Sequence, residues 1–595
     1  MTHSPDPGPG PGPDPAVIPG ALADRPPPGL GATLGPLAFR AGLDRETDAF
    51  AVAGRRAIVH GDDTGIREVL GHPFRVAAGP RVVGAGPAAA TVTPLGAERR
   101  LTMDGRPVTE RIVASRDAPV VWMEWTADQA TALELEWTVA VRDPGPVPLA
   151  WRDGGRVFWL APDPAVGAGG APGAGAGPRS AAGAGPWAAF IFSAEPGPLH
   201  AAGGDDGGVR LRARVAVPGG DGLRLAMVLA RAGDDGDRLF RIAGRTAVAL
   251  RARAGAADRL LKEGLRVTGS DPALGPALDR DRIDLTLRPA EPVGPWTAPG
   301  LAAHGLDRLA AGDFDGARTI LDFLLDRVDD DGAAARGVGP RFTGRDDPAA
   351  GTATLRLLAR WLAWTGDLAA AGQRWPAALR LVEAGAARGT AARELAVVAE
   401  ELGDRRTAEA LKAAGESEGQ PAGEGRPGAG SRGSDGPGRG PGTRSGPGPG
   451  PGPGDVVRRV VHGVLGAEPD APRGRLVLRP RLAGDRLEVR GLAVGPAAVG
   501  VVYRRERNRH RLEVRQEQGG PPLQLVLEPE LIGGRVTAVR VDGEPAELDV
   551  VQVPWDGEDG NAPGAGLATS DRRWRVPVQL VLDRPRTLDV DVAPG

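Results

Sequence analysis

The chain has 595 residues and a formal net charge of −3 at pH 7, which argues against a protein that binds nucleic acid through a basic surface field. It has no cysteine, which excludes disulfide scaffolds, thiolate metal sites and thiol catalysis, and its seven histidines are scattered singly, so we predict neither a metal nor a cofactor. No apolar run is long enough for a membrane span, and the first residues lack the regions of a secretory signal, so we expect a cytoplasmic protein without membrane or nucleic-acid partners.

The N-terminal part of the sequence predicts a disordered tail followed by β-strands. Residues 1–35 are rich in proline and glycine, which predicts a disordered tail. Residues 36–290 contain short alternating stretches broken by glycine, proline and aspartate, the pattern of a β-sandwich domain. Its clearest strands are expected at 120–126, 133–141, 156–162, 187–194 and 209–217, with a long loop at 163–186. We expect the sandwich to be filled by Trp122, Trp125, Trp137 and Trp159.

Residues 291–415 change to helical apolar spacing. Three hairpins are expected, each with a Gly-Asp turn, and Asp313 and Asp367 of the first two turns are expected to cap the helices that follow. Their helices are expected at 301–313 and 314–330, 349–365 and 367–385, and 390–402 and 404–415. This segment is predicted to be a helical-hairpin domain of about six helices.

Residues 416–455 form a low-complexity run of glycine, proline, serine and arginine, which predicts a disordered linker. Residues 456–595 return to period-2 alternation with turn residues between the stretches, which predicts a C-terminal β-sandwich domain. The fold class expected for the whole chain is multidomain α+β.

The order of these parts resembles bacterial six-hairpin glycosidases with an (α/α)6 toroid, and most of all the glycogen-debranching, amylo-α-1,6-glucosidase-like proteins. Three stretches carry the resemblance: GLAAHGLDRLAAGDFDGARTILDFLLDRVDDDG at 300–332, TATLRLLARWLAWTGDLAAAGQRWPAALRLV at 352–382, and the strands of 476–531. These stretches are packing and turn motifs. The resemblance implies a truncated α/α toroid of helical hairpins between two β-sandwiches, and a protein of carbohydrate metabolism.

The sequence also departs from that family. A complete toroid has twelve helices, and about six are expected here. Thr352 stands where the family has a carboxylate, and Arg356 stands where it has an aromatic residue on which a sugar ring could stack. These departures favour a shortened relative whose catalysis is impaired.

Glycoside hydrolysis needs two carboxyl groups on opposite sides of the scissile bond, one as acid and one as base or nucleophile. Asp346 and Asp347 are the candidate catalytic pair, because they stand in a loop that enters a helix of the hairpin domain. The alternative is a solvated turn and helix cap before Pro348. FTGRD at 342–346 resembles an F-x-G-R-D element of the family, which makes Arg345 a candidate substrate-binding residue.

Two tryptophans of the hairpin domain are candidate sugar-binding residues. Trp361 and Trp364 are three positions apart, which places them on one helix face, where an aromatic ring could stack on a pyranose. The alternative is that both fill the core between the helices.

Three functions remain open from the sequence. The first is an active glycoside hydrolase on α-glucan. The second, which we favour slightly, is a catalytically impaired relative that binds α-glucan or acts as a scaffold. Its incomplete ring would leave apolar helix flanks to be covered by the sandwiches, the linker or a second copy in a homodimer. The third is a helical interaction module that binds no sugar.

Overall fold

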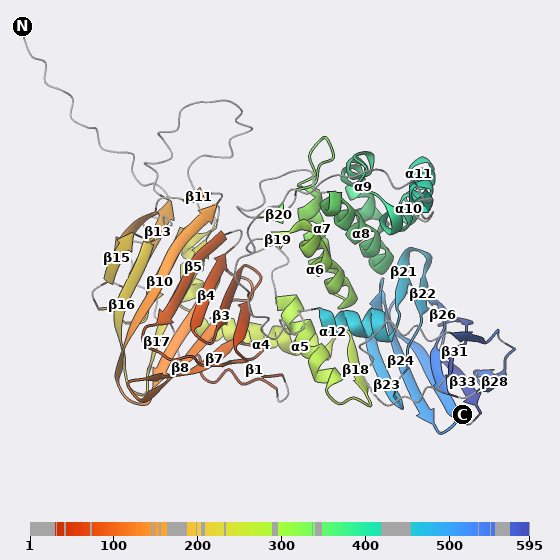
Figure 1. The fold of residues 1–595 in the computed structure, drawn as a ribbon, viewed down its shortest axis with the longest axis horizontal. Helices are drawn as coiled ribbons and strands as arrows, with labels where there is room; N and C mark the ends of the chain where they lie inside the picture. The colour runs from red at the N-terminus through yellow and green to blue at the C-terminus, as the bar shows by residue number, and fades with distance from the viewer. Residues whose placement is uncertain are drawn as a thin grey trace, which may run out of the picture. The chain divides into compact units, whose positions relative to one another are not determined.

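The computed structural model describes the chain in segments. These are residues 30, 33–40, 43–71, 74–143, 145–146, 149–153, 156–162, 187–194, 196–197, 199–203, 209–230, 234–287, 296–335, 337–338, 348–417, 454–482, 484–533, 535–547, 549–553 and 572–593. The chain divides into two compact units (Figure 1). Unit 1 comprises Met1–Lys262, Thr286–Thr297 and Gly337–Thr343, and unit 2 comprises Glu263–Leu285, Ala298–Arg336 and Gly344–Gly595. The protein is a multidomain α+β protein.

Unit 1 contains two large antiparallel sheets. In the described residues, one sheet has nine strands in the order β1 (Arg45–Thr47), β6 (Ala90–Val92), β7 (Ala97–Met103), β8 (Arg106–Ala114), β9 (Val120–Ala127), β17 (Gly222–Ala230), β14 (Trp187–Phe192), β13 (Val157–Pro162) and β12 (Leu149–Asp153). The other has β15 (Leu199–Gly203), β16 (Val209–Val217), β10 (Thr131–Asp143), β5 (Phe74–Val82), β4 (Gly65–Gly71), β3 (Ala57–Asp62) and β2 (Ala49–Ala53), with β11 (Gly145–Pro146) beside β10. The short strands β19 (Trp296–Thr297) and β20 (Gly337–Val338) pair separately.

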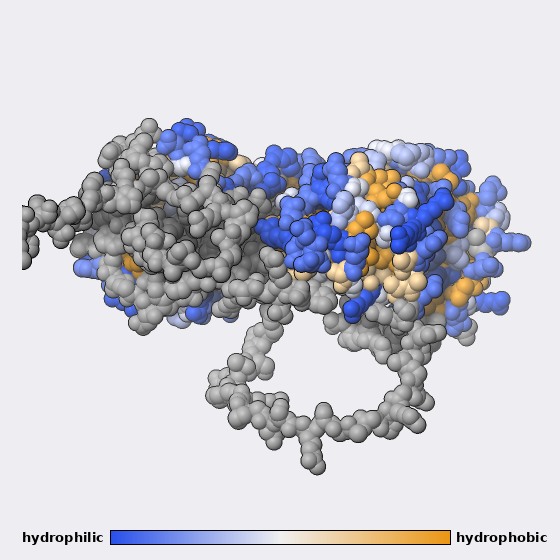
Figure 2. Space-filling model, turned by 90° about the horizontal axis from the view of Figure 1, so that it is seen from above, coloured by the Kyte–Doolittle hydropathy of each residue, from blue (hydrophilic) through white to orange (hydrophobic). Residues whose placement is uncertain are grey.

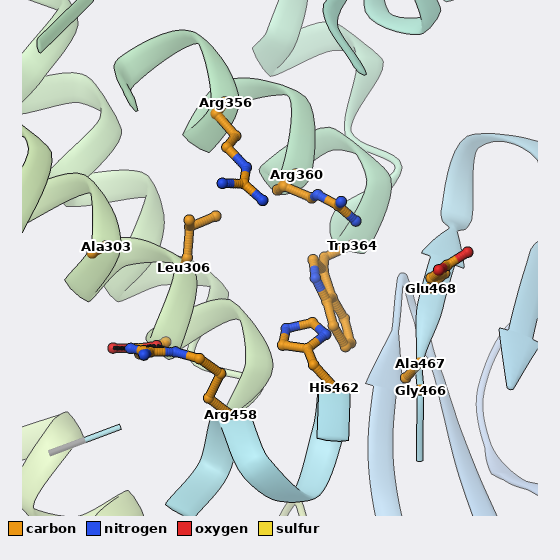
Figure 3. A pocket seen from close by; sticks show the side chains of 11 residues that line it. Ala303, Leu306, Arg356, Arg360, Trp364, Arg458, His462, Gly466, Ala467 and Glu468 are labelled. Carbon is orange, nitrogen blue, oxygen red and sulfur yellow. Dashed lines mark hydrogen bonds and ion pairs between the residues drawn. The ribbon is translucent and has the colours of Figure 1, made fainter. Parts of the chain in front are cut away.

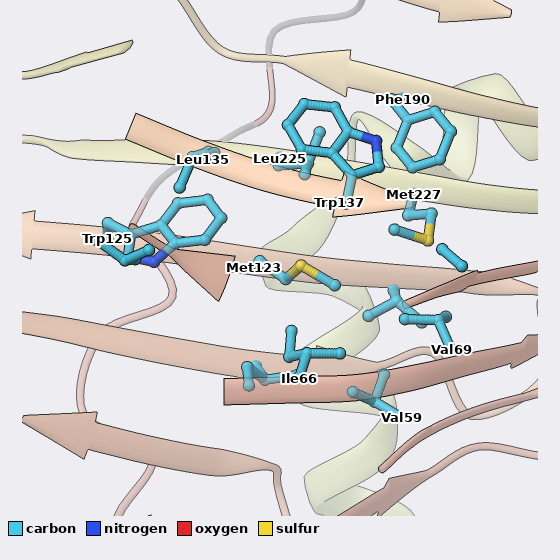
Figure 4. Close-up of a cluster of buried hydrophobic side chains, with 14 of the residues drawn as sticks. Val59, Ile66, Val69, Met123, Trp125, Leu135, Trp137, Phe190, Leu225 and Met227 are labelled. Atoms are coloured by element: carbon cyan, nitrogen blue, oxygen red, sulfur yellow. The ribbon is translucent and has the colours of Figure 1, made fainter. Parts of the chain in front are cut away.

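The two sheets enclose one apolar core, as Figure 4 shows. Trp125 of β9 and Trp137 of β10 are buried in it, and the ring of Trp137 lies 5.9 Å from that of Phe190. Since successive side chains of a strand point to opposite faces, Trp122 cannot share this core with Trp125. Its indole packs on the other face and donates a hydrogen bond to the Ala243 carbonyl at 2.9 Å.

The expectation for these tryptophans was therefore right for Trp125 and Trp137 and wrong for Trp122. The side chain of Trp159 lies outside the described part of the structure. The face on which Trp122 packs is covered by two helices, α3 (Gly236–Ala243) and α4 (Thr246–Lys262), which the strand pattern of 36–290 did not indicate.

The same face also holds the start of the described chain. Leu30 and Leu34 are buried there, although the composition of 1–35 predicted a disordered tail. The Leu34 N–H donates to the buried carboxylate of Glu124 at 3.2 Å. These leucines supply apolar surface that the proline and glycine around them lack. Residues 1–29 and the predicted loop 163–186 lie outside the described residues.

Unit 2 begins with an element that completes a distant sheet. Strand β18 (Arg266–Gly269) pairs antiparallel with β23, with Val267 opposite Val489, and helix α5 (Leu274–Leu287) follows it. Residues 263–285 were expected in the N-terminal β-sandwich domain, whereas in the structure they belong to unit 2. The edge position of β18 depends on a partner more than 200 residues away, which local patterns do not report.

In the described part of 298–417, six helices form three hairpins, as predicted. They are α6 (Ala298–Ala310), α7 (Phe314–Leu325), α8 (Pro348–Thr365), α9 (Leu368–Glu383), α10 (Gly389–Glu401) and α11 (Arg405–Ser417). Helix α8 packs against both α6 and α10, and each of these three pairs with the helix that follows it. The predicted caps are present, since Asp313 accepts from the Gly316 N–H at 3.0 Å and Asp367 accepts from the Ala370 N–H at 2.9 Å.

The rest of unit 2 is mostly antiparallel β structure. After the predicted linker, of which 418–453 lie outside the described residues, the chain forms helix α12 (Asp455–Arg458), the π-helical turn η1 (Arg459–Val464) and the 3-10 turn η2 (Ala471–Arg473). Seven strands of the described residues then form a sheet in the order β18, β23 (Arg486–Val494), β24 (Ala497–Glu506), β25 (Arg509–Gln518), β33 (Arg586–Val592), β28 (Val536–Val541) and β29 (Glu544–Pro545).

Two smaller sheets complete the described part of unit 2. One contains β21 (Glu468–Asp470), β22 (Arg475–Leu478), β26 (Gln524–Leu527) and β32 (Val578–Val581), and β22 and β26 run parallel. The other contains β27 (Glu530–Gly533), β31 (Arg572–Arg575) and β30 (Val551–Val553). The period-2 strands predicted for 456–595 are thus present.

The described residues expose few large apolar side chains. The coloured residues in Figure 2 are mostly hydrophilic, and the hydrophobic ones form small groups. Within α6 to α11 as described, Val397 is the large apolar side chain that is exposed, at 36%. An incomplete ring was expected to leave apolar flanks that the sandwiches, the linker or a second copy would cover, and helices α6 and α8 are contacted by α12, η2, β21 and β23. None of the described helices is long and apolar enough to cross a membrane.

Candidate functional site

A cavity of about 440 Å³ lies in unit 2 between the helical hairpins and the segment that follows the linker (Figure 3). This volume is typical of a small-molecule site. Its walls come from α6, α8, α12, η1 and the start of β21, and the lining residues are Ala303, Leu306, Asp307, Arg356, Arg360, Trp364, Arg458, His462, Gly466, Ala467 and Glu468. The cavity therefore combines charged groups with an aromatic and aliphatic wall.

Helix α12 is fixed beside α6 by two carboxylates. Asp281 of α5 is buried and accepts hydrogen bonds from the backbone N–H groups of Gly454, Val456 and Val457 at 2.6, 2.9 and 2.9 Å. These N–H groups open α12 and have no partner within the helix, so the carboxylate caps it from a distant part of the chain. Burial raises the pKa of Asp281 above its ordinary value, and the three hydrogen bonds act against that rise.

The second carboxylate is Asp307 of α6, which forms one wall of the cavity. It accepts from Nε and Nη2 of Arg458 at 3.0 and 2.7 Å, and its other oxygen accepts from Nη2 at 2.8 Å. Asp307 is 5% exposed, and burial raises its pKa while Arg458 lowers it. Both carboxylate oxygens of Asp307 are thus engaged by Arg458.

Two guanidinium groups of α8 stand on the opposite side of the cavity from Arg458 in Figure 3. Arg356 and Arg360 are four positions apart, so both lie on one helix face, and both approach Glu394 of α10. Arg360 donates to Glu394 at 2.6 Å, whereas the Nε of Arg356 lies 3.7 Å from it. Among the described residues Arg356 donates no hydrogen bond, and its side chain is 51% exposed. Its donors are therefore available to a ligand.

His462 and Trp364 lie between these two groups of charges. Their rings are 6.4 Å apart and nearly perpendicular. The removal of His462 from water lowers its pKa, and the positive charges of Arg360 and Arg458 lower it further. His462 is therefore neutral at pH 7 and faces a region of positive potential.

Besides Asp307, the cavity wall contains the carboxylate of Glu468, at the start of β21. It pairs with Arg479 at 2.6 Å, and Arg479 also donates to Glu528 at 2.8 Å. Both carboxylates of the wall thus have a guanidinium partner. In the described residues no group of three or more histidine, aspartate and glutamate side chains is arranged to hold a metal ion.

The residues predicted from the sequence are distributed unevenly around this cavity. Asp346, Asp347 and Arg345 lie outside the described residues. Trp364 lines the cavity, although it is only 2% exposed. Trp361 does not line it, and its ring instead lies under the guanidinium of Arg374 on α9, with 5.8 Å from ring centre to the guanidinium carbon. The two tryptophans therefore do not form one stacking surface.

Several lining residues were missed by sequence reasoning. Asp307 lies in a predicted helix with an ordinary helical neighbourhood. Arg458 and His462 directly follow the low-complexity run, and their spacing of four within an apolar pattern is the signal that could have indicated a helix there. Arg356 was noted for standing in the place of an aromatic residue, and the structure puts it on the cavity wall.

No family of known sequences matches this chain, and no curated protein matches it either. Among solved structures it is similar to a bacterial glucoamylase complexed with acarbose, at 11% identity over 65% of this chain and 68% of that one, with a TM-score of 0.42. A putative kojibiose phosphorylase from the human microbiome matches at 5% identity over 81% and 94%, with a TM-score of 0.46.

A family GH92 alpha-mannosidase from Bacteroides thetaiotaomicron matches at 9% identity over 62% of this chain and 61% of that one, with a TM-score of 0.37. The similarity to glycosidases that the sequence indicated is thus also found among solved structures. At these values it describes a distant overall resemblance, and the function proposed below does not rest on it.

Proposed function

We propose that this protein binds a carbohydrate in the cavity of unit 2 and does not hydrolyse it. The observation that carries the proposal is that both carboxylates of the cavity wall, Asp307 and Glu468, are held in ion pairs with arginines. Glycoside hydrolysis requires one protonated carboxyl group and one carboxylate that is free to act as base or nucleophile. Asp307 would have to leave Arg458 before it could take either role.

The remaining groups of the cavity suit binding. Sugar sites combine an apolar surface for the ring with polar groups for the hydroxyls. Here Leu306 and Trp364 supply apolar surface, and guanidinium and imidazole groups supply hydrogen-bond donors. An α-glucan of the kind used by glycogen-debranching proteins is the neutral ligand to test first.

The alternative is an active hydrolase on α-glucan. It keeps Asp346 and Asp347 as the catalytic pair, with Arg345 as a substrate-binding residue. One observation also favours acid chemistry at the cavity itself, since burial raises the pKa of Asp307. A helical module without sugar binding has less support, because the described helices expose little apolar surface for a partner.

Two measurements on the full-length protein separate these functions. The first is release of reducing sugar from maltose, maltotriose and glycogen between pH 5 and 7. The second is calorimetric binding of the same sugars. Binding without release supports the proposal. Release that is lost in Asp346→Asn or Asp347→Asn establishes a hydrolase with the predicted pair, and release lost in Asp307→Asn or Glu468→Gln places hydrolysis in the cavity.

A further inference from the structure

The cavity carries more positive than negative charge, and the excess lies at its α8 side. Its wall has three guanidinium groups, those of Arg356, Arg360 and Arg458, against the two carboxylates of Asp307 and Glu468. The excess belongs to the groups that line the cavity, because behind them Arg479 also pairs with Glu528 and Arg458 also approaches Asp455. The imbalance is therefore local to the site.

The excess can be assigned to particular atoms. Arg458 pairs with Asp307 and Arg479 pairs with Glu468, so both carboxylates of the wall already have a guanidinium partner. On α8, by contrast, Arg356 and Arg360 share one carboxylate, that of Glu394. Nη2 of Arg360 lies 2.6 Å from one oxygen of Glu394, and Nε of Arg356 lies 3.7 Å from the other. The hydrogen-bond donors of the Arg356 guanidinium are thus left at the cavity wall without an acceptor among the described residues.

Arginine is the common basic residue of this chain, so its identity alone means little. The placement is the informative feature, because two guanidinium groups converge on one carboxylate beside a cavity. A planar guanidinium is well suited to two parallel hydrogen bonds with a carboxylate or a phosphate group. Burial lowers the pKa of His462, and Arg360 and Arg458 lower it further.

We infer that the cavity prefers a sugar that carries an anionic oxygen group, a carboxylate or a phosphate ester, and that Arg356 and Arg360 receive this group. The inference rests on the proposed function, since it names the ligand class of the same site. The sugar ring then lies toward Leu306 and Trp364, and its hydroxyl groups lie within reach of Arg458 and His462. Neutral α-glucan ends bind the same cavity more weakly, because the guanidinium of Arg356 then keeps only its 3.7 Å ion pair with Glu394 and gains no hydrogen bond.

The test is calorimetric titration of the full-length protein at low ionic strength in a buffer without phosphate. The ligands are glucose, glucose 6-phosphate, glucuronate and inorganic phosphate. We expect at least one of the two anionic sugars to bind about tenfold or more tightly than glucose, the size of effect expected for hydrogen bonds to charged groups. The two anionic sugars distinguish a phosphate site from a carboxylate site.

The matched variants are Arg356→Gln and Arg393→Gln. Both remove one positive charge, but Arg393 is exposed on α10 and does not line the cavity. We expect Arg356→Gln to abolish the preference for the anionic sugar and Arg393→Gln to keep it. Because Arg356 is half-exposed and donates no hydrogen bond to the described residues, its replacement should leave the melting temperature unchanged, which checks folding.

Equal affinity for glucose and both anionic sugars would overturn the inference and leave the proposed function intact. So would a preference that survives Arg356→Gln, or inorganic phosphate binding as tightly as glucose 6-phosphate, since no sugar would then be recognised. Failure of all sugars, neutral and anionic, would overturn the proposed function together with the inference.

Discussion

Asp307 and Arg458 lie 151 residues apart in the chain, and their side chains join helix α6 to the segment that returns after the low-complexity run. The carboxylate of Asp307 is almost fully buried, whereas half of the Arg458 side chain is exposed. Removing Arg458 should therefore destabilise the protein more than removing Asp307. Without Arg458 the buried carboxylate of Asp307 loses its partner, whereas water can solvate Arg458.

The first prediction concerns this pair. Arg458→Gln should destabilise unit 2 by about 1–3 kcal/mol, the cost of leaving a buried acceptor unsatisfied. The neighbouring Arg459→Gln is the control, because Arg459 is exposed and does not line the cavity. Guanidinium unfolding followed by circular dichroism measures both variants. Equal midpoints for the two would show that the pair contributes nothing to stability.

The second prediction concerns the backbone at the start of α12. Gly454 has φ +96°, and a Cβ atom there would lie 2.5 Å from an oxygen of Asp307. Gly543 has φ +86°, but a Cβ atom there would meet open space. Gly543→Ala should therefore cost only the backbone strain, roughly 1–2 kcal/mol. Gly454→Ala should cost more, because the buried carboxylate must also move.

Thermal unfolding of the two glycine variants under one buffer condition makes the comparison direct. A smaller drop in melting temperature for Gly454→Ala than for Gly543→Ala would contradict the close approach of α12 to Asp307.

The same segment shows what the sequence could and could not predict. The six helices of the hairpins lie close to their predicted bounds, because apolar spacing and aspartate caps such as Asp313 and Asp367 are local signals. Helix α12 is four residues long, and its cap, Asp281, lies 173 residues earlier. Strand β18 likewise depends on β23. Both elements are specified by tertiary partners, which spacing within one segment does not reveal.

The site illustrates this limit more sharply. Its wall combines α6, α8 and the α12–η1 segment, so no single stretch of sequence contains all the polar side chains of the site. Trp361 and Trp364 were predicted as a pair because residues three positions apart share one helix face. The cavity, however, borders only part of that face of α8. Trp364 reaches the cavity, and Trp361 is turned toward Arg374. The sequence predicts which helices form, and packing decides which residues meet.

The third prediction concerns the N-terminal β-sandwich of unit 1. Glu124 is fully buried and accepts from Arg224 at 3.0 Å and from the Leu34 N–H, with Arg111 at 3.5 Å. Glu124→Gln should destabilise unit 1 by about 3–5 kcal/mol, the usual cost of removing one partner from a buried ion pair. Glu134→Gln, at an exposed position of β10, should have little effect.

Limited proteolysis gives a second measurement for Glu124→Gln. Because Leu34 loses its acceptor, cleavage within residues 30–40 should become faster in this variant than in Glu134→Gln. Unchanged cleavage together with unchanged stability would mean that Glu124 does not anchor the start of the described chain.

The fourth prediction concerns pH. His510 is 1% exposed, and burial lowers its pKa to about 4, while Tyr503 lies within hydrogen-bond distance at 2.9 Å. An unfolded histidine has a pKa near 6.5, so between pH 6.5 and 4 the unfolded chain binds a proton that the folded chain does not. Stability must fall as pH falls through this window, by about 3 kcal/mol in total.

The variant His510→Gln isolates that contribution. It removes the titrating group while keeping a polar side chain near Tyr503, so it should be less stable than the native protein at pH 7 but lose less stability on going to pH 4. Urea unfolding at pH 7, 5.5 and 4 measures the slope. The same slope in both proteins would assign the pH dependence to other groups.

The last prediction separates the two tryptophans of α8. If the cavity binds a sugar, Trp364→Phe should weaken binding of the best ligand by several-fold, because Trp364 lines the cavity and supports the ring of His462. Trp361→Phe should leave binding unchanged and lower stability instead, by roughly 1 kcal/mol for the smaller ring in a closed core. Calorimetric titration and thermal unfolding of both variants give four values. An effect on binding from Trp361 as large as that from Trp364 would show that the sugar is held elsewhere, because the ring of Trp361 has no surface in the cavity.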